Sequence, residues 1–363
     1  KGEDVFLGND LRITGTPDEL GSVEPAYGAK RDIAPGDSFV CSASAAWTNA
    51  EETVAATCIG YKVYTNDVVY VEGPNNSFTY THPDCEKGAK LVWQWAFKCK
   101  IVPTVRGSGS ASVSGDGWFA SGETATVTAV PAEGWSFRCW EGDVPEEQKF
   151  NAALHLPVGT TLPALTAVFG ESFFVSTTGD DSKSGRSWGE ALATVEAALE
   201  KGGDAPCINV AEGLYEIQTA IKVTTGAAIV GSGERGAVFR LAAQPVAGDD
   251  TRAVFYVAND DAVLRNLALT TGGAERGRGL YLNGGTVAYC AITNCVTVNG
   301  NMDGGGVYLK TGTLRDSLVH YNQASSSGNY QKHGGGIYMA GGLADRCVIR
   351  DNYVCYKRGE SGS

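Results

Sequence analysis

The sequence predicts an all-β protein of more than one domain, and three observations lead to that prediction. The chain has 363 residues, two to three times the length of a typical domain. Glycine accounts for 48 of them without the three-residue period of collagen, so turns are frequent. Tyr256, Tyr281, Tyr308 and Tyr338 are separated by 25, 27 and 30 residues, which are the spacings of stacked β coils.

Composition and charge exclude several classes of protein. Hydrophobic residues make up 43% of the chain and charged residues only 19%, which indicates a folded protein. No apolar run reaches about 18 residues, so no membrane span is expected. The formal net charge of −12 repels nucleic acid over most of the surface. The chain starts at Lys1 rather than methionine, so we expect a processed end or a cut fragment, from which any signal peptide has already gone.

Residues 1–102 are expected to form the first domain, a β module built from short strands separated by Gly, Pro, Asn and Asp. In the segment KLVWQWAFK, every second residue is large and apolar, namely Leu91, Trp93, Trp95 and Phe97. That alternation predicts a strand with one buried face, so the tryptophans are assigned to the core. The alternative is an exposed pair of tryptophans that stacks on sugar.

Four of the ten cysteines lie in this first module. Cys41 and Cys58 are expected on successive strands of one antiparallel pair and therefore to form a disulfide, with Cys85 and Cys99 as a second bridge. Four cysteines allow three pairings, so the connectivity stays open. Clustered cysteines in a small β module favour an oxidising, extracytoplasmic location. No CxxC pair is present, so no zinc or other metal site is predicted.

The second predicted domain, residues 103–170, repeats the plan of the first. Its segment SGETATVTAVPAEGWSFRCWEGD aligns with the earlier one when Gly122 is matched to Gly36 and Trp140 to Tyr61. The GETxTVTAxP and GWxFxxWxGD segments resemble the divergent internalin-type B-repeat, a β-grasp-like module. Members of that family are mostly spacers or adhesive stalks on bacterial surface proteins, so the resemblance implies display rather than catalysis.

The third predicted domain covers residues 171–363 and opens with one amphipathic helix. Apolar residues recur at helical spacing from Trp188 to Leu199, Ser187 and Glu190 form a capping box, and Gly202 ends the helix. A helix followed by a strand and then repeats resembles the N-terminal cap of right-handed parallel β-helix proteins of the pectate-lyase-like superfamily. There, the helix covers the open end of the coils.

In the repeats behind this helix, each tyrosine strand is followed by a second strand. Aligning Asn322 with Asn352 also aligns Ser317 with Cys347, and Cys290 takes the same column one coil earlier. Like residues then stack from coil to coil. Five further cysteines are interpreted as small buried side chains rather than bridges: Cys207, Cys290, Cys295, Cys347 and Cys355. The GGGxY turns also resemble polymorphic outer-membrane autotransporter passengers. Because the chain stops directly after a coil, we expect the native protein to continue.

Candidate ligand-contacting residues lie on the coils. Enzymes on the resembled fold use Asp pairs, or Ca²⁺-bound carboxylates with Arg or Lys, in a groove along one face. The candidates here are Arg278, Lys310, Arg315, His320, Lys332, His333 and Arg350, with Asp303 and Arg346 also considered. None forms a catalytic signature, and solvated turn residues are the simpler interpretation. Column alignment places Arg315 between Ala288 and Asp345, whose carboxylate is expected to neutralise it. His320 is expected beside Thr293 and Arg350.

Charge suggests one partner. From Arg265 to Arg358 there are ten Lys and Arg against five Asp and Glu, although the whole chain is acidic. Such a stretch could receive an acidic polysaccharide or a host or cell-surface glycan, unless alternation of faces disperses the charges. The pairs Asp180–Asp181, Asp249–Asp250 and Asp260–Asp261 could ligate Ca²⁺, but solvated turns explain them better and no cofactor is expected. GSGERG at 231–236 lacks the helix of a nucleotide loop.

The leading hypothesis is a secreted or surface-displayed bacterial protein, a non-catalytic adhesin or glycan-contacting β-helix on a β-module stalk. Two alternatives are kept: a polysaccharide lyase or glycoside hydrolase of the pectate-lyase-like superfamily, and a structural spacer. Elimination would require a cation and a base that converge on one sugar. We therefore expect no lyase activity on polyuronates and at most weak, salt-sensitive binding to acidic glycans.

Overall fold

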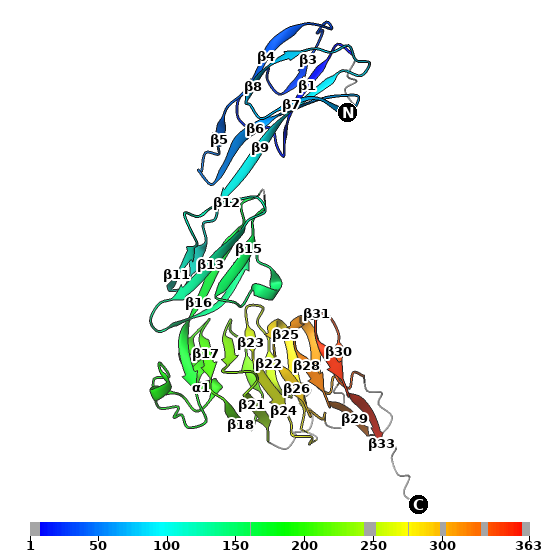
Figure 1. Cartoon of the computed structure of the whole chain (residues 1–363). Coiled ribbons are helices and arrows are strands. Elements are labelled where there is room, and N and C mark those ends of the chain that lie inside the picture. The colour runs from blue at the N-terminus through cyan, green and yellow to red at the C-terminus, as the bar shows by residue number, and fades with distance from the viewer. Residues whose placement is uncertain are drawn as a thin grey trace, which may run out of the picture. The chain divides into compact units, whose positions relative to one another are not determined.

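The computed structural model describes residues 8–159, 161–242, 252–274, 276–297, 303–327 and 333–357 (Figure 1). With 53% of residues in strands and 4% in helices, it confirms the all-β prediction. The chain divides into two compact units: one holds the residues up to Thr104 with Ala111–Ala129 and Cys139–Ala167, and the other holds Val105–Ser110, Val130–Arg138 and the chain from Val168 onward. The domain boundaries predicted after residues 102 and 170 stay predictions.

The first unit contains a seven-stranded sheet in which only β1 and β9 pair in parallel among the pairings described here. Its strands are β1 (Leu11–Thr16), β3 (Gly28–Lys30), β5 (Ala46–Thr48), β6 (Val54–Thr65), β7 (Val68–Gly73), β9 (Ala89–Lys100) and β12 (Trp118–Ala120). The alternation predicted for β9 is confirmed, because Leu91, Trp93, Trp95 and Phe97 are at most 7% exposed. These tryptophans are core residues.

Two three-stranded sheets resemble each other in their strand order. One is formed by β2 (Val23–Glu24), β4 (Ser38–Ala43) and β8 (Ser77–Thr81), the other by β11 (Gly109–Val113), β13 (Thr124–Pro131) and β15 (Ala153–Pro157). Gly36 and Gly122 precede β4 and β13, each with φ +92°. Gly36 N donates to His82 O and Gly122 N donates to Val158 O, so the two glycines occupy equivalent turns. The remaining strands of this region are β10 (Thr104–Arg106), β14 (Trp135–Gly142) and β16 (Leu165–Val175), and η1 (Glu146–Gln148) is a short 3₁₀ turn.

The predicted Cys41–Cys58 disulfide is wrong. Cys41 lies on β4 and Cys58 on β6, and these strands belong to different sheets, so the two residues are not cross-strand neighbours. Cys85 and Cys99 are also free thiols: the sulfur of Cys85 contacts Gly8 O and that of Cys99 contacts Gly159 O. Of the cysteines expected as small buried side chains, Cys207, Cys290 and Cys295 are buried, whereas Cys347 is only half-buried. The side chain of Cys355 lies outside the described residues.

In the second unit, parallel strands stack coil upon coil (Figure 1). The tyrosine sheet, named for its ladder of rings, contains β17 (Cys207–Val210), β19 (Ile221–Val223), β20 (Ala228–Gly231), β22 (Ala253–Val257), β23 (Val263–Arg265), β25 (Arg278–Ala288), β27 (Val307–Arg315), β30 (Ile337–Met339) and β31 (Leu343–Asp345). The second parallel sheet contains β18 (Gly213–Ile217), β21 (Ala237–Leu241), β24 (Leu267–Thr270), β26 (Ala291–Thr293), β28 (Leu318–His320) and β32 (Val348–Arg350). A third pairs β29 (Gln323–Ser327) with β33 (Tyr353–Lys357).

The predicted coil register is confirmed. Tyr256 pairs with Tyr281, Tyr281 with Tyr308, and Tyr308 with Tyr338, in parallel each time. Between the tyrosine sheet and the second sheet the chain bends through one left-handed residue per coil. These residues are Asn266, Tyr289, Asp316 and Arg346, with φ between 47° and 57°. The bend therefore recurs although the residue type does not.

The helix begins later than predicted. Ser187 makes no capping bond, and Trp188–Glu190 is a 3₁₀ turn (η2), whereas α1 spans Val195–Gly202. Thr194 is its N-cap, with Oγ1 accepting from Ala197 N at 3.1 Å. Asp181, thirteen residues upstream, accepts from Thr194 Oγ1 and from the backbone N–H groups of Ala193 and Thr194. Val195 and Ala198 pack into the apolar core of the coils.

Candidate functional site

A row of tyrosine rings runs along the outer face of the tyrosine sheet. Consecutive rings of Tyr256, Tyr281, Tyr308 and Tyr338 have centroids 4.9, 4.9 and 5.2 Å apart. The flanking residues of Tyr256, Tyr281 and Tyr308, such as Leu280 and Leu282 beside Tyr281, are buried in the core, so these rings point outward; all four rings are half-buried. This row is called the tyrosine ladder. Partial burial raises the pKa of Tyr281 and of Tyr308, which keeps their hydroxyls protonated.

Arg278 lies against the ladder but is buried. Its guanidinium carbon is 5.5 Å from the ring centre of Tyr281 and 5.2 Å from that of Tyr308. Its Nε and Nη2 donate to Asp303 O at 3.2 and 3.0 Å. The sequence analysis took Arg278 as a ligand-contacting candidate. At 2% exposure it instead supports the rings and the Asp303 turn and offers no open contact to a ligand.

Two other predicted residues lie near the ladder. His333 is exposed, its ring centre is 6.2 Å from that of Tyr338, and its Nδ1 is 3.5 Å from Asp303 Oδ1. Lys310 is exposed two residues beyond Tyr308 on β27, at a point where the register between β25 and β27 shifts. Lys332 lies outside the described residues. Of the predicted residues near the ladder, Lys310 and His333 are therefore exposed and Arg278 is buried beneath the rings.

Arg315 is bound by Asp316 and is not part of this group. It stands between Ala288 and Asp345 as predicted, but its Nε binds Asp316 Oδ2 at 3.0 Å while Asp345 Oδ2 binds Arg346 Nη1 at 2.7 Å. The expected neutralisation of Arg315 by Asp345 is therefore wrong. Asp316 sits at the left-handed bend, and its carboxylate also accepts from Arg346 Nε at 2.7 Å. The pKa of Asp316 is lowered, chiefly by the hydrogen bond from Arg346 and also by the one from Arg315. Partial burial acts in the opposite direction but is outweighed.

His320 belongs to a third group, on the second parallel sheet. It stands between Thr293 and Arg350, as predicted. Its Nδ1 and the Thr293 Oγ1 are buried and have no hydrogen-bond partner among the described residues. Burial, Arg350 and Arg235 lower the His320 pKa, whereas Asp351 opposes them. Arg350 itself binds Asp351 at 3.0 Å.

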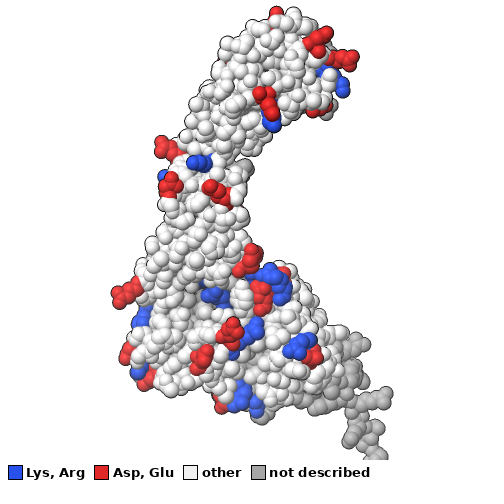
Figure 2. Space-filling view, viewed as in Figure 1, with Lys and Arg blue, Asp and Glu red and all other residues white. Residues whose placement is uncertain are grey.

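The structure disperses the basic stretch that the sequence suggested. Figure 2 shows basic and acidic side chains intermixed over the coils on the viewed face. Arg315, Arg346 and Arg350 all have carboxylate partners. Three of the charged residues counted between Arg265 and Arg358 lie outside the described residues, namely Glu275, Lys332 and Arg358. The tyrosine ladder is therefore a better candidate for a binding surface than the basic stretch.

The acidic pairs have structural roles where they are described. Asp181 holds the start of α1, Asp180 Oδ1 accepts from Ser182 N, and Asp261 O accepts from Arg138 Nη2 at 3.1 Å. Asp249–Asp250 lies outside the described residues. Within the described ranges, no group of three His, Cys, Asp or Glu side chains is placed to hold a metal ion.

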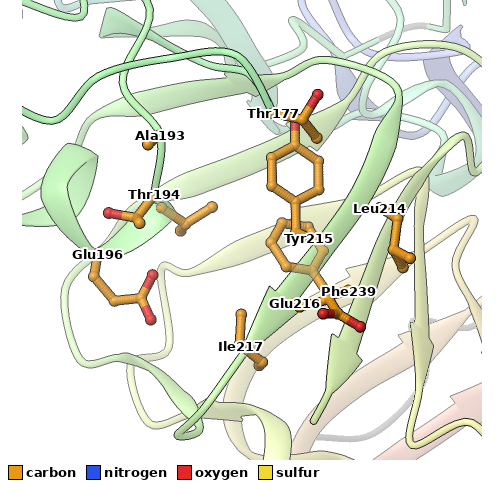
Figure 3. A pocket seen from close by; sticks show the side chains of 10 residues that line it. Thr177, Ala193, Thr194, Glu196, Leu214, Tyr215, Glu216, Ile217 and Phe239 are labelled. Carbon is orange, nitrogen blue, oxygen red and sulfur yellow. The ribbon is translucent and has the colours of Figure 1, made fainter.

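Sequence reasoning missed a pocket between the start of α1 and strand β18 (Figure 3). Its cavity volume is about 180 Å³, and its lining includes Glu196, Tyr215, Glu216 and Phe239. Tyr215 was seen only as part of a strand, because nothing in its spacing links it to a helix twenty residues earlier. The sequence signal that could have pointed to this pocket is charge, since residues 171–217 hold nine acidic and three basic side chains.

Comparison with known proteins gives two findings. Residues 101–172 match the family described as the divergent InlB B-repeat domain, and such domains are typical of extracellular bacterial surface proteins. Among solved structures, the chain is similar to the pectin methylesterase PemA from Erwinia chrysanthemi, with 15% identity, 44% of this chain covered and a TM-score of 0.31. The match spans 56% of that enzyme's chain. No curated protein matches. None of the described helices is long and apolar enough to cross a bilayer.

Proposed function

We propose that the chain is part of a secreted or surface-displayed bacterial protein that contacts a glycan along the tyrosine ladder without catalysing a reaction on it. In this proposal the coils form a right-handed parallel β-helix of the pectate-lyase-like type with α1 as its cap, and the N-terminal β modules form a stalk. The B-repeat match at 101–172 supports surface display. The single observation on which glycan contact depends is the ladder itself.

The ladder suits a linear, hydroxyl-rich ligand. Each phenol both donates and accepts a hydrogen bond, as sugar hydroxyls do. Centroid spacings of 4.9–5.2 Å repeat one such group per coil in a straight row, so several weak contacts add along one chain. Exposed Lys310, two residues from Tyr308 on β27, adds attraction for carboxylate or sulfate groups, which makes binding to acidic glycans sensitive to salt.

The test is binding of the whole chain to neutral and acidic polysaccharides, compared with Tyr281→Phe and Tyr308→Phe. These variants keep the stacked rings and remove only the hydroxyls, so each should weaken binding by about two- to tenfold. Tyr321→Phe is the control, because Tyr321 is an exposed tyrosine on another bend of the coils. Lys310→Ala should weaken only the acidic glycans.

The alternatives give different results. Equal binding by wild type and the ladder variants would reject the ladder as the contact surface. A spacer would bind none of the polysaccharides. Unsaturated product absorbing in the ultraviolet, lost in Arg315→Ala or His320→Ala, would replace the proposal with a polysaccharide lyase.

A further inference from the structure

The pocket beside α1 combines an apolar floor with one available carboxylate. Tyr215 and Phe239 form the floor, with their rings stacked at 4.9 Å and 18°. Figure 3 shows Glu196 on one side of the pocket and these two rings on the other. The cavity volume of about 180 Å³ resembles that of cavities of about 150 Å³ that accept a six-carbon ring. It suits a ligand group of five or six heavy atoms.

The two carboxylates of the pocket are in different states. Glu216 binds Arg240 and so already has a cation. Glu196 is exposed to solvent and has no ion-pair partner among the described residues. A carboxylate without a cation partner favours a ligand that supplies one.

The start of α1 does not turn the pocket into an anion site. The N–H of Ala197 is satisfied by Thr194 Oγ1, and those of Ala193 and Thr194 are satisfied by Asp181. The surrounding charge has the same sign as Glu196, because residues 171–217 hold nine acidic and three basic side chains. Anions are repelled here and cations are attracted.

We propose that this pocket binds an alkylammonium group of the lysine side-chain type, with the alkyl chain over Tyr215 and Phe239 and the ammonium at Glu196. An aliphatic stem with a charged head matches an apolar floor with a polar rim. Both a free alkylamine and a lysine in a peptide carry this group. The pocket is separate from the tyrosine ladder. Its proposed ligand is a cation, whereas the ladder is proposed to contact neutral or acidic glycans.

Ligand-observed NMR titration of the whole chain tests the proposal with three probes: n-butylammonium chloride, Nα-acetyl-lysine amide and the uncharged Nα-acetyl-norleucine amide. At least one cationic probe should bind and the norleucine amide should not. Binding of the lysine amide alone would assign the pocket to a lysyl side chain, and binding of both cations would assign it to alkylamines in general.

Glu196→Gln should lower the affinity by at least about tenfold, because it removes the charge and keeps the shape. Glu200→Gln is the matched control, since Glu200 is exposed on the same helix outside the pocket, and it should stay within about twofold. Unchanged thermal unfolding of Glu196→Gln shows that the fold is intact. Equal binding of the norleucine amide, wild-type affinity in Glu196→Gln, or no binding of either cation would overturn the proposal.

Discussion

Asn322 and Asn352 stack one coil apart, with Asn322 Nδ2 donating to Asn352 Oδ1 at 3.0 Å. Asn322 also accepts from Cys295 N at 3.0 Å and donates to Ile292 O at 2.9 Å, and it is completely buried. The side chain thus satisfies backbone groups of the preceding coil while binding the following one. A buried polar residue of this kind ties three coils together.

We expect Asn322→Ala to lower the free energy of unfolding by about 2–4 kcal/mol, because it leaves buried backbone groups of Cys295 and Ile292 without partners. Chemical denaturation followed by circular dichroism measures the loss. Asn283→Ala, which removes a half-buried asparagine bonded to Thr311 at 3.4 Å, should cost less than about 0.5 kcal/mol. Equal stabilities of the two variants would contradict the ladder role of Asn322.

Buried thiols should resist alkylation in the native protein. Burial raises the pKa of Cys41, Cys290 and Cys295 to about 12, so the reactive thiolate is nearly absent at pH 8. Half-buried Cys85 and Cys347 should be modified before these three. Mass spectrometry after native iodoacetamide treatment gives the order. A Cys41–Cys58 disulfide in a non-reducing peptide map would refute the strand assignment.

Asp316→Asn should destabilise the coils at neutral pH by about 1–2 kcal/mol, since Arg315 and Arg346 both lose the ion pair with Asp316, although Arg346 keeps the one with Asp345. Asparagine accepts the left-handed φ of 48°, so the backbone is not the cause. The folded-state pKa of Asp316 is lowered, so its contribution is full above the unfolded-state pKa and is lost as pH falls through the folded-state value. Wild type and variant should converge in strong acid.

The control for this comparison is Asp351→Asn. Asp351 also has a left-handed φ, 55°, and binds one arginine at 3.0 Å, but on the exposed surface. Its loss should change stability by less than about 0.5 kcal/mol. If both variants lose the same stability, the network around Asp316 contributes nothing beyond a surface ion pair.

His320 should make the fold sensitive to mild acid. Its folded-state pKa is lowered, chiefly by burial, so the folded protein binds a proton less readily than the unfolded chain does. Stability is therefore retained above the ordinary histidine value of about 6.5 and lost as pH falls below it. Scanning calorimetry at several pH values should show a smaller decline in Tm for His320→Gln. Arg350→Gln, which removes a positive neighbour, should give an intermediate decline.

Repeat spacing explains which parts of the fold could be predicted. The columns of Tyr256 to Tyr338 and of Asn322 and Asn352 follow from spacing along the chain, because each coil sets its neighbour in parallel register. The start of α1 could not be predicted in this way. Asp181 holds Thr194 from thirteen residues upstream, and that contact exists only after the turn between them has folded.

Site residues were harder to predict for the same reason. The alignment correctly placed Arg315 opposite Asp345, but a strand register gives Cα positions and not side-chain directions. The left-handed bend turns Asp316 toward both arginines, so the adjacent residue takes the ion pair. The prediction of a Cys41–Cys58 disulfide was wrong because sequence order does not tell which consecutive strands belong to the same sheet.

The tyrosine ladder also gives this protein an optical signature. Its four phenol rings are held at fixed interplanar angles of 31°, 13° and 34°, which makes them a chiral array of neighbouring chromophores. Such fixed aromatic packing generates near-ultraviolet circular dichroism that vanishes when the packing is lost. Because each coil contributes one ring, coils that open one at a time would dim this signal in steps, whereas cooperative melting would erase it at once. The spectrum can therefore report how many coils remain closed.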